Sequence, residues 1–210
     1  SVVYKRQAEQ GAAEILSLHI SESLSATVNS ARIAAEQYSS VPITVLDSGQ
    51  LSLGLGFLVE QAAGFAENGL KLDEIVAKIR ELMPRTYVFA ALDTLEYLRR
   101  SGRMHIAVAR FGEILRLKPL LYMNQGNANA FRVRTRQKAR ARLHEWLDEL
   151  SPFEQLAVVH AGVPSRAKEL AEQARHHVPS GELPVIQITP VLGANLGVGA
   201  LGFAGIAKGE

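Results

Sequence analysis

The stretch EILSLHISESLSATVNSARIAAEQYSSVPITVL, residues 14–46, decides the fold of the first part of the chain. It begins and ends with short apolar runs, 14–19 and 41–46, and the pattern between them is helical to about Gln37. Apolar strands that alternate with helices are typical of a parallel sheet covered on both faces. Two more helices are predicted over 51–68 and 72–82. We therefore assign residues 1–84 to an N-terminal α/β lobe with a mainly parallel sheet.

The remaining residues, 85–210, predict a second α/β lobe with a mixed sheet. Asn124-Gln125-Gly126-Asn127 lies between two apolar runs, as expected for a β-hairpin. The predicted strands are 87–91, 117–123, 131–135, 155–160 and 185–189, and the predicted helices are 94–100, 137–150 and 165–177. The fold class is thus α/β in two lobes, a parallel sheet flanked by helices followed by a mixed sheet with a hairpin and helices.

A glycine-rich stretch, PVLGANLGVGALGFAG (190–205), contains G-x-G-x-x-G at Gly197, Gly199 and Gly202. A dinucleotide site needs a helix after these glycines and an acidic residue about 20 positions further on. Only eight residues follow Gly202, so the sequence argues against nucleotide binding. We interpret the stretch as a glycine-rich strand end, where the backbone packs closely on another strand or surrounds a small anion.

The amino-acid composition argues against a disulfide-bonded, thiol-dependent or membrane-spanning protein. The chain has no cysteine, which excludes disulfides and thiolate chemistry. No apolar run approaches the ~18 residues of a membrane span, and the polar first residues do not resemble a signal sequence. We expect a cytoplasmic protein without stable membrane insertion.

Positive charge is concentrated in one segment. Between Arg99 and Arg142, twelve Lys and Arg residues stand against one acid, Glu113, although the whole chain has a net charge of only +2. The segment predicts a surface for an anionic partner, or simply a solvated face. It lacks the interleaved aromatic residues that stack on bases, so no nucleic acid is expected.

Hydroxyl side chains gather before the first long helix, at Ser21, Ser23, Ser25 and Thr27. One of them is expected to cap the helix, and the others to face a ligand, because a helix N-terminus with hydroxyls suits a carboxylate. No catalytic or metal motif is present. The adjacent histidines 176 and 177 are expected to interact with a helix dipole rather than a metal.

Five segments resemble, in order, motifs of the DegV family. They are ISESLSATVNSA (20–31), VLDSGQLSLGLG (45–56), LDTLEYLRRSGRM (92–104), LRLKPLLYMNQG (115–126) and LGANLGVGALG (192–202). The resemblance implies a protein that holds one long-chain fatty acid, such as palmitate, in a buried tunnel, with the carboxylate in the cleft between the lobes. It also implies a partner, the catalytic subunit of a fatty acid kinase, which forms the acyl phosphate. The protein itself would then be neither an enzyme nor the carrier of a cofactor.

The resemblance assigns roles to individual residues. Ser25 is expected to hydrogen-bond the carboxylate, with Ser21 and Thr27 as further ligand-binding candidates from the same cluster. Arg103 is expected to position the head group or to meet the kinase. Asn195 stands in the place of the family's histidine, so charge stabilisation of the carboxylate is expected to be weaker.

Further departures concern the start of the chain and two small residues. The family's first strand and its T-S-Q-P-S segment have no counterpart here, so we expect weak binding from a chain without them. Ala26 replaces a glycine, and Val198 replaces a proline.

A buried tail alone could supply roughly 10 kcal/mol, at ~0.8 kcal/mol for each CH₂ group. The low aromatic content, 6%, suits a narrow aliphatic tunnel as well as an ordinary core. The alternative is an enzyme that acts on a small carboxylate or acyl phosphate, with Ser25, His160 and Arg103 in the cleft. His160 could equally be a satisfied core histidine.

Overall fold

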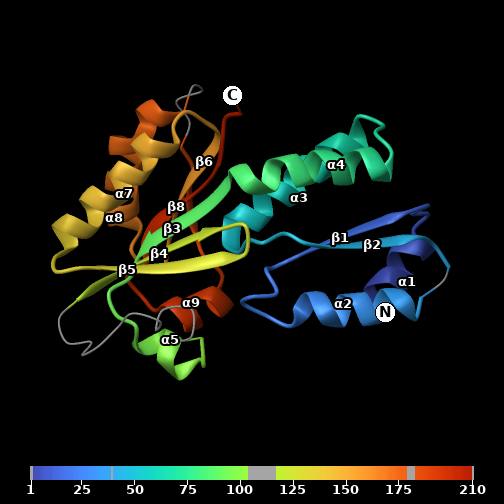
Figure 1. The fold of residues 1–210 in the computed structure, drawn as a ribbon, viewed down its shortest axis with the longest axis horizontal. Helices are drawn as coiled ribbons and strands as arrows, with labels where there is room; N and C mark the ends of the chain where they lie inside the picture. Colours follow the sequence, from blue (N-terminus) through green and yellow to red (C-terminus); the bar gives the residue numbers. More distant parts are fainter. Residues whose placement is uncertain (1, 39, 104–116, 179–182, 210) are drawn as a thin grey trace.

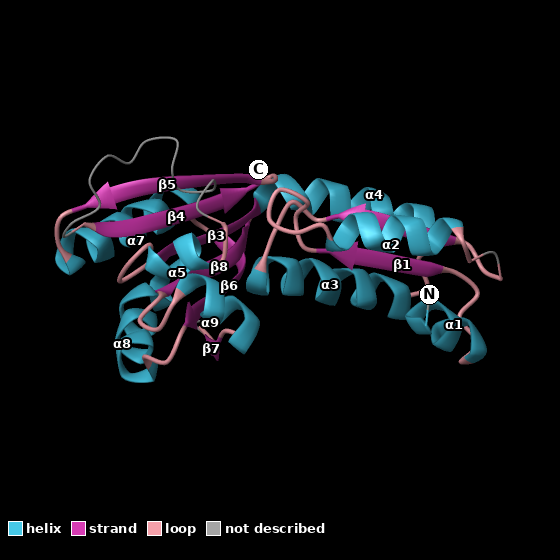
Figure 2. Cartoon of the chain, turned by 90° about the horizontal axis from the view of Figure 1, so that it is seen from below, coloured by secondary structure: helices cyan, strands magenta, loops and turns pink. Residues whose placement is uncertain are grey.

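The computed structural model describes residues 2–38, 40–103, 117–178 and 183–209. It is an α/β fold with a small parallel sheet and a larger mixed sheet, both flanked by helices, as predicted. Figures 1 and 2 show the two sheets displaced from each other along the long axis. Within the described ranges, no helix combines the length and apolar character needed to cross a bilayer.

The small sheet consists of β1 (Ile15–His19) and β2 (Ile43–Asp47), which pair in parallel. It lies between two helical layers: α1 (Val2–Glu9) with α2 (Thr27–Glu36), and α3 (Ser52–Glu67) with α4 (Leu72–Leu82). The Tyr4 hydroxyl ties the first layer to the sheet, because it pairs with Ser17 Oγ at 3.0 Å and donates to Ala31 O at 3.4 Å. The strand, helix and strand expected between residues 14 and 46 are confirmed.

The large sheet has the strand order β5-β4-β3-β8-β6-β7. Its strands are β3 (Thr86–Ala91), β4 (Lys118–Asn124), β5 (Asn127–Val133), β6 (Phe153–His160), β7 (Val185–Gln187) and β8 (Leu201–Ala207). β6 and β7 pair in parallel and the other neighbours pair antiparallel, so the sheet is mixed. The predicted hairpin is confirmed, although β5 begins directly after the turn, at Asn127, rather than at residue 131.

The glycine-rich stretch differs from its prediction. It is not a strand end: residues 190–196 form helix α9 (Pro190–Leu196), and β8 follows as a central strand whose seven residues are all buried. The expected close packing does occur, since a Cβ at Gly202 would collide with the backbone of β3 at Phe89 and Ala90. Small residues are therefore needed where β8 passes its neighbour.

Helices cover both faces of the large sheet. On one face, α7 (Arg136–Leu150) and α8 (Pro164–Ala174) bury Phe89 and Phe203. On the other face, α3 packs against β3, β6 and β8, and the same apolar cluster includes Leu46 of the small sheet. Shorter helices complete the fold: η1 (Met83–Arg85), α5 (Glu96–Arg100) and η2 (Arg175–His177). Because α3 contacts both sheets, the division into lobes at residues 84 and 85 stays a prediction.

Candidate functional site

The predicted hydroxyl residues lie in the connection between β1 and α2, residues 21–27, here called the hydroxyl loop. Ser21 is the buried anchor of this loop, with 1% of its surface exposed. Its backbone N–H donates to Gln50 O at 2.8 Å, and its carbonyl accepts from Leu24 N and Ser25 N. The Ser21 and Ser23 hydroxyls pair at 3.0 Å. The loop therefore has a fixed backbone at the carboxyl end of β1.

Ser25 and Thr27 form the outer part of the hydroxyl loop. Their hydroxyl oxygens are 2.7 Å apart, and Ser25 Oγ also accepts from Thr27 N at 3.3 Å. The capping residue of α2 is Ala26, which has no side-chain capping bond. A hydroxyl does accept from the first backbone N–H of α2, as expected, but it belongs to Ser25, one position before the N-cap residue. Ser25 is half-buried and Thr27 is exposed, so both hydroxyls lie where a ligand can reach them.

A second loop, residues 47–50 at the end of β2, supports the hydroxyl loop. Asp47 Oδ2 accepts from Glu22 N at 3.2 Å, and Asp47 Oδ1 accepts from Gly49 N at 2.9 Å. Gln50 is fully buried, and its Nε2 donates to Thr86 O at 2.6 Å. Gln50 therefore joins the hydroxyl loop to the large sheet. Sequence reasoning missed it, because its bond to Thr86 joins segments 36 residues apart.

The turn of the β4–β5 hairpin contacts the loop of residues 47–50. Gly126 N donates to Gly49 O at 2.9 Å, and Asn124 Nδ2 donates to Thr86 O at 2.9 Å. Gly49 has a φ of +61°, and a Cβ there would lie 2.8 Å from Gly126 N. Glycine is required here because the turn approaches so closely and because the backbone is left-handed.

Apolar side chains continue from the hydroxyl loop toward α5 and α9. Leu24, Ala128 and Ile188 all pack against the cluster that fills the space between α3 and the large sheet. Ile188 also packs against a second cluster, to which Leu98 of α5 belongs and on which Leu196 of α9 packs. Polar hydroxyls and a continuous apolar region therefore adjoin each other at this end of the molecule.

Asn195 and Arg103 lie on the α9 and α5 side of this region. Asn195 Nδ2 donates to Val191 O at 2.8 Å, within its own helix, and Arg103 Nη1 donates to Ser101 O at 2.8 Å. The two elements meet where the Tyr97 ring fills the space that a Cβ at Gly197 would need. The structure thus places α5 against α9, but the bonds of these two residues are local. Their role toward a ligand stays a prediction.

In the described part of the chain, His160 does not form a catalytic pair with Ser25. His160 is buried on β6, its Nδ1 accepts from Val163 N at 3.3 Å, and burial lowers its pKa. The Ser25 hydroxyl pairs with Thr27 instead.

His177 is also buried. Its Nδ1 pairs with Ser151 Oγ at 3.2 Å, and its Nε2 lies 3.5 Å from Asp148 Oδ1. Burial is the main cause that lowers its pKa, aided by His176, against the opposing charge of Asp148. The possible ligand atoms of Asp148, His176 and His177 lie within 4.8 Å of one another. The predicted interaction of this histidine pair with a helix dipole is not tested by these contacts.

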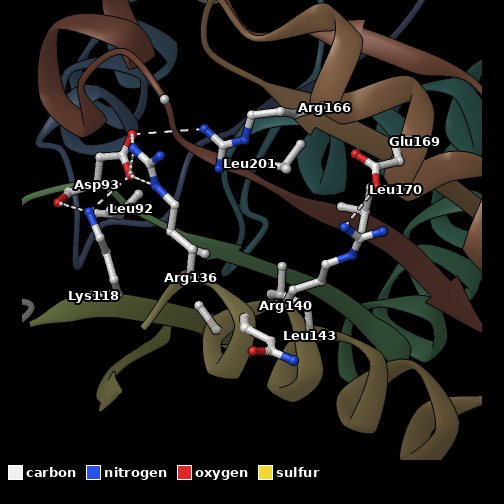
Figure 3. Close-up of a pocket in the computed structure, with 14 residues that line it drawn as sticks. Leu92, Asp93, Lys118, Arg136, Arg140, Leu143, Arg166, Glu169, Leu170 and Leu201 are labelled. Atoms are coloured by element: carbon white, nitrogen blue, oxygen red, sulfur yellow. Dashed lines mark hydrogen bonds and ion pairs between the residues drawn. The ribbon is translucent and has the colours of Figure 1, made fainter. Parts of the chain in front are cut away.

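A pocket of about 310 Å³ lies over the other face of the large sheet (Figure 3). Its charged lining comes from the basic part of the sequence, including Lys118, Arg136 and Arg140, and from Arg166 of α8. Sequence reasoning noticed the basic segment but missed the pocket, because Asp93, Arg136 and Arg166 are far from one another in sequence. Residues 104–116 of the basic segment lie outside the described residues.

Comparison with known proteins matches residues 1–208 to a family described as an uncharacterised protein, DegV family. The chain belongs to the DegV family. This DegV family member is 41% identical over 204 residues to a DegV domain-containing protein of Streptomyces coelicolor, an alignment that covers 95% of the chain and 72% of that relative. The resemblance seen in the five motifs is thus confirmed.

Two solved structures resemble this DegV family member closely. One is DegV of Bacillus subtilis, described as a fatty acid binding protein, with 29% identity and a TM-score of 0.86 over 99% of this chain and 75% of that one. The other is a DegV family protein of Thermus thermophilus, whose structure is described as showing fatty acid binding. It has 31% identity and a TM-score of 0.84 over 98% of this chain and 75% of that one.

Proposed function

We propose that this chain binds a long-chain fatty acid such as palmitate, with the carboxylate at the hydroxyl loop and the tail along the adjoining apolar region. The observation that carries the proposal is the fold shared with two DegV proteins described as binding fatty acids. The hydroxyl loop agrees with it, because Ser25 and Thr27 present hydroxyls at the N-terminus of α2. Hydroxyl donors and the helix dipole both favour an anionic head group there.

The apolar region gives the tail a place beside the head group. Leu24 lies between two serines of the hydroxyl loop and packs into the apolar cluster, while Ile188 links that cluster to α5 and α9. Each CH₂ group removed from water contributes ~0.8 kcal/mol, so the tail supplies most of the affinity. Asn195 and Arg103, on the α9 and α5 side, would then contact or position the head group. Asn195 would donate a neutral hydrogen bond, which gives a carboxylate less stabilisation than a cation.

We further propose that the chain is a non-catalytic, cytoplasmic carrier that presents the carboxylate to the catalytic subunit of a fatty acid kinase. Arg132 and Arg134 support this role, because both are exposed at the end of β5 and continue the basic surface of α7. A cationic face of this kind steers association with an acidic partner surface. The bound acid, rather than a residue of this chain, would be the group that reacts.

The first test is native mass spectrometry of the purified full-length protein incubated with palmitate. We expect one bound palmitate, and at least tenfold weaker binding for Ser25→Ala, because the carboxylate loses a hydrogen bond to a group that bears charge. Ser30→Ala is the matched control: Ser30 is an exposed serine of α2 whose hydroxyl donates to Ala26 O of the same turn at 3.4 Å. No uptake of palmitate by the unaltered full-length protein, in either the presence or the absence of lipid carriers, would refute the proposal.

The second test addresses the kinase. The double variant Arg132→Glu and Arg134→Glu is expected to weaken association with a fatty acid kinase subunit at least tenfold, measured by surface plasmon resonance, while palmitate binding stays unchanged. Arg175→Glu is the control, since Arg175 is exposed and lies on η2, away from β5. Equal loss in both variants would point to net charge alone, and unchanged association would contradict the proposed docking face.

A further inference from the structure

The pocket of Figure 3 lies between the large sheet and the first turns of two helices. Arg136 and Arg140 come from the first turns of α7, and Arg166 comes from the first turn of α8. Lys118, at the start of β4, and Asp93, just after β3, complete its charged wall. Lys118, Arg136 and Arg166 point toward Asp93, whereas Arg140 points toward Glu169 of α8 (Figure 3).

The carboxylate of Asp93 lies close to three cationic side chains of this wall. Asp93 lies 3.1 Å from Lys118 Nζ, 3.1 Å from Arg136 Nη2 and 3.8 Å from Arg166 Nη1. Burial acts to raise the pKa of Asp93, but hydrogen bonds and charge from Lys118 and Arg136 outweigh it, and the pKa is lowered. Asp93 therefore stays ionised and partly neutralises a surplus of positive charge.

The charge of the pocket remains unbalanced. Arg140 has its own partner, Glu169, at 3.0 Å, so four cations face two acids across the lining. Both α7 and α8 begin at the pocket. Their N-terminal ends add partial positive charge there, because the first N–H groups of a helix have no partner within the helix. The cavity can therefore accommodate a ligand that carries about two negative charges.

The floor of the pocket is apolar. Leu92, Ala139, Leu143, Leu170 and Leu201 line it beneath the charged groups. A volume of about 310 Å³ is at the lower end of the range for small-molecule sites, roughly 300–1,000 Å³. A ligand that fits both parts has a compact apolar body and one strongly anionic group.

We propose that this pocket binds a phosphate monoester with a small apolar body. A phosphate monoester carries about −1.5 to −2 charges at neutral pH, which matches the uncompensated charge, whereas a carboxylate carries only one. Planar guanidinium groups such as those of Arg136 and Arg166 bind phosphate through paired hydrogen bonds. None of the lining residues belongs to the hydroxyl loop, so this site does not depend on the proposed fatty acid function.

Asp93 has a specific part in the proposal. In the structure its carboxylate occupies the position of an anion among Lys118, Arg136 and Arg166, so an incoming phosphate competes with it for the same donors. Removing the charge of Asp93 should therefore strengthen phosphate binding. If the ion cluster were only structural, removing the charge of Asp93 should weaken phosphate binding, because loss of the central acid would loosen the pocket.

The experiment is isothermal titration calorimetry of the full chain with phenyl phosphate, inorganic phosphate and benzoate. We expect phenyl phosphate to bind more tightly than inorganic phosphate, because only it fills the apolar floor, and more tightly than benzoate, because of its charge. Arg136→Gln combined with Arg166→Gln is expected to weaken phenyl phosphate binding at least tenfold, and Asp93→Asn to strengthen it several-fold. Arg142→Gln is the control, since Arg142 lies on α7 but pairs with Glu145 and Glu149 at 2.9 Å, outside the pocket.

Circular dichroism and thermal unfolding establish that each variant is folded before its affinity is compared. Absence of phenyl phosphate binding at millimolar concentration would overturn the proposal. So would affinity that survives the double arginine substitution, because the ligand would then bind elsewhere. Weaker binding by a folded Asp93→Asn variant would show that the acid supports the pocket instead of competing with the ligand, and would also overturn it.

Discussion

The two sheets of this protein differ in how completely they are buried. Every residue of β8, in the large sheet, is buried between α3 on one face and α7 and α8 on the other. In the small sheet, only Leu46 of the ten strand residues is buried, and the others are half-buried. A sheet of two strands is marginal unless helices cover it. The small sheet therefore depends on α3, which belongs to the cores of both sheets.

This difference bears on the candidate site. The hydroxyl loop is attached to the less buried sheet, whereas its support through Gln50 and the hairpin comes from the large one. Regions with fewer buried contacts open at lower free energy than the core. The hydroxyls proposed to meet the ligand are thus on the more easily opened part of the molecule, beside the well-buried large sheet. Ligand entry by local opening would then leave the large sheet intact.

The largest expected effect is on the free energy of unfolding, and it compares a core substitution in each of the two sheets. Phe203→Ala removes a fully buried ring from the centre of the large sheet, and should lower the free energy of unfolding by about 3–5 kcal/mol. Leu18→Ala, on the half-buried β1, should cost less than half as much. Urea unfolding measures both, and native-state hydrogen exchange should show Leu18→Ala loosening the small sheet alone. Equal losses would mean that the two sheets are equally stabilised by burial.

The second prediction tests the connection between the sheets. Gln50→Ala removes the bond to Thr86 O and leaves a small space in the core, so it should cost about 1–3 kcal/mol. Amide exchange in the hydroxyl loop should accelerate more than exchange in β8. Gln10→Ala, an exposed glutamine after α1, should change stability by less than about 0.5 kcal/mol. Unchanged exchange in the hydroxyl loop would show that Gln50 does not support it.

The smallest expected effect concerns pH and the large sheet alone. Burial lowers the pKa of His177 below its usual value of 6.5, so the folded state favours the neutral ring while the unfolded chain binds a proton. The stabilisation is present above 6.5 and is lost as the pH falls through the lowered pKa. Thermal unfolding between about pH 7.5 and 5.5 should therefore show a weaker pH dependence for His177→Gln than for His176→Gln. The same dependence in both variants would contradict this origin.

The elements that sequence reasoning predicted well have a clear local signal. α4 begins and ends where its pattern indicated, because its first turn carries acids and Ile75, Ile79 and Leu82 form one buried face. β8 was missed for the opposite reason. Its sequence, LGFAGIA, contains glycine and alanine, which have low strand propensity. The close approach of β3 explains Gly202, and the close approach of β6 explains Gly205.

The candidate site was predictable to a similar extent. The hydroxyls of the β1–α2 connection could be found because they are close in sequence, and the chain does place them in one loop. Gln50, Asp93 and Arg166 act through contacts that join distant segments, and no spacing rule foretells such contacts. Whether Ser25, Asn195 and Arg103 meet one ligand depends on these distant contacts too.

The position of β8 has a consequence for synthesis of the protein. In the large sheet, β8 lies between β3 and β6, which do not pair with each other. The group β5-β4-β3 is therefore joined to the pair β6-β7 only through β8. While the ribosome is still making residues 201–207, the nascent chain carries two separate strand groups with open hydrogen-bonding edges. Such edges attract other chains. Production of this protein in cells should therefore be sensitive to chaperones until that last strand is released.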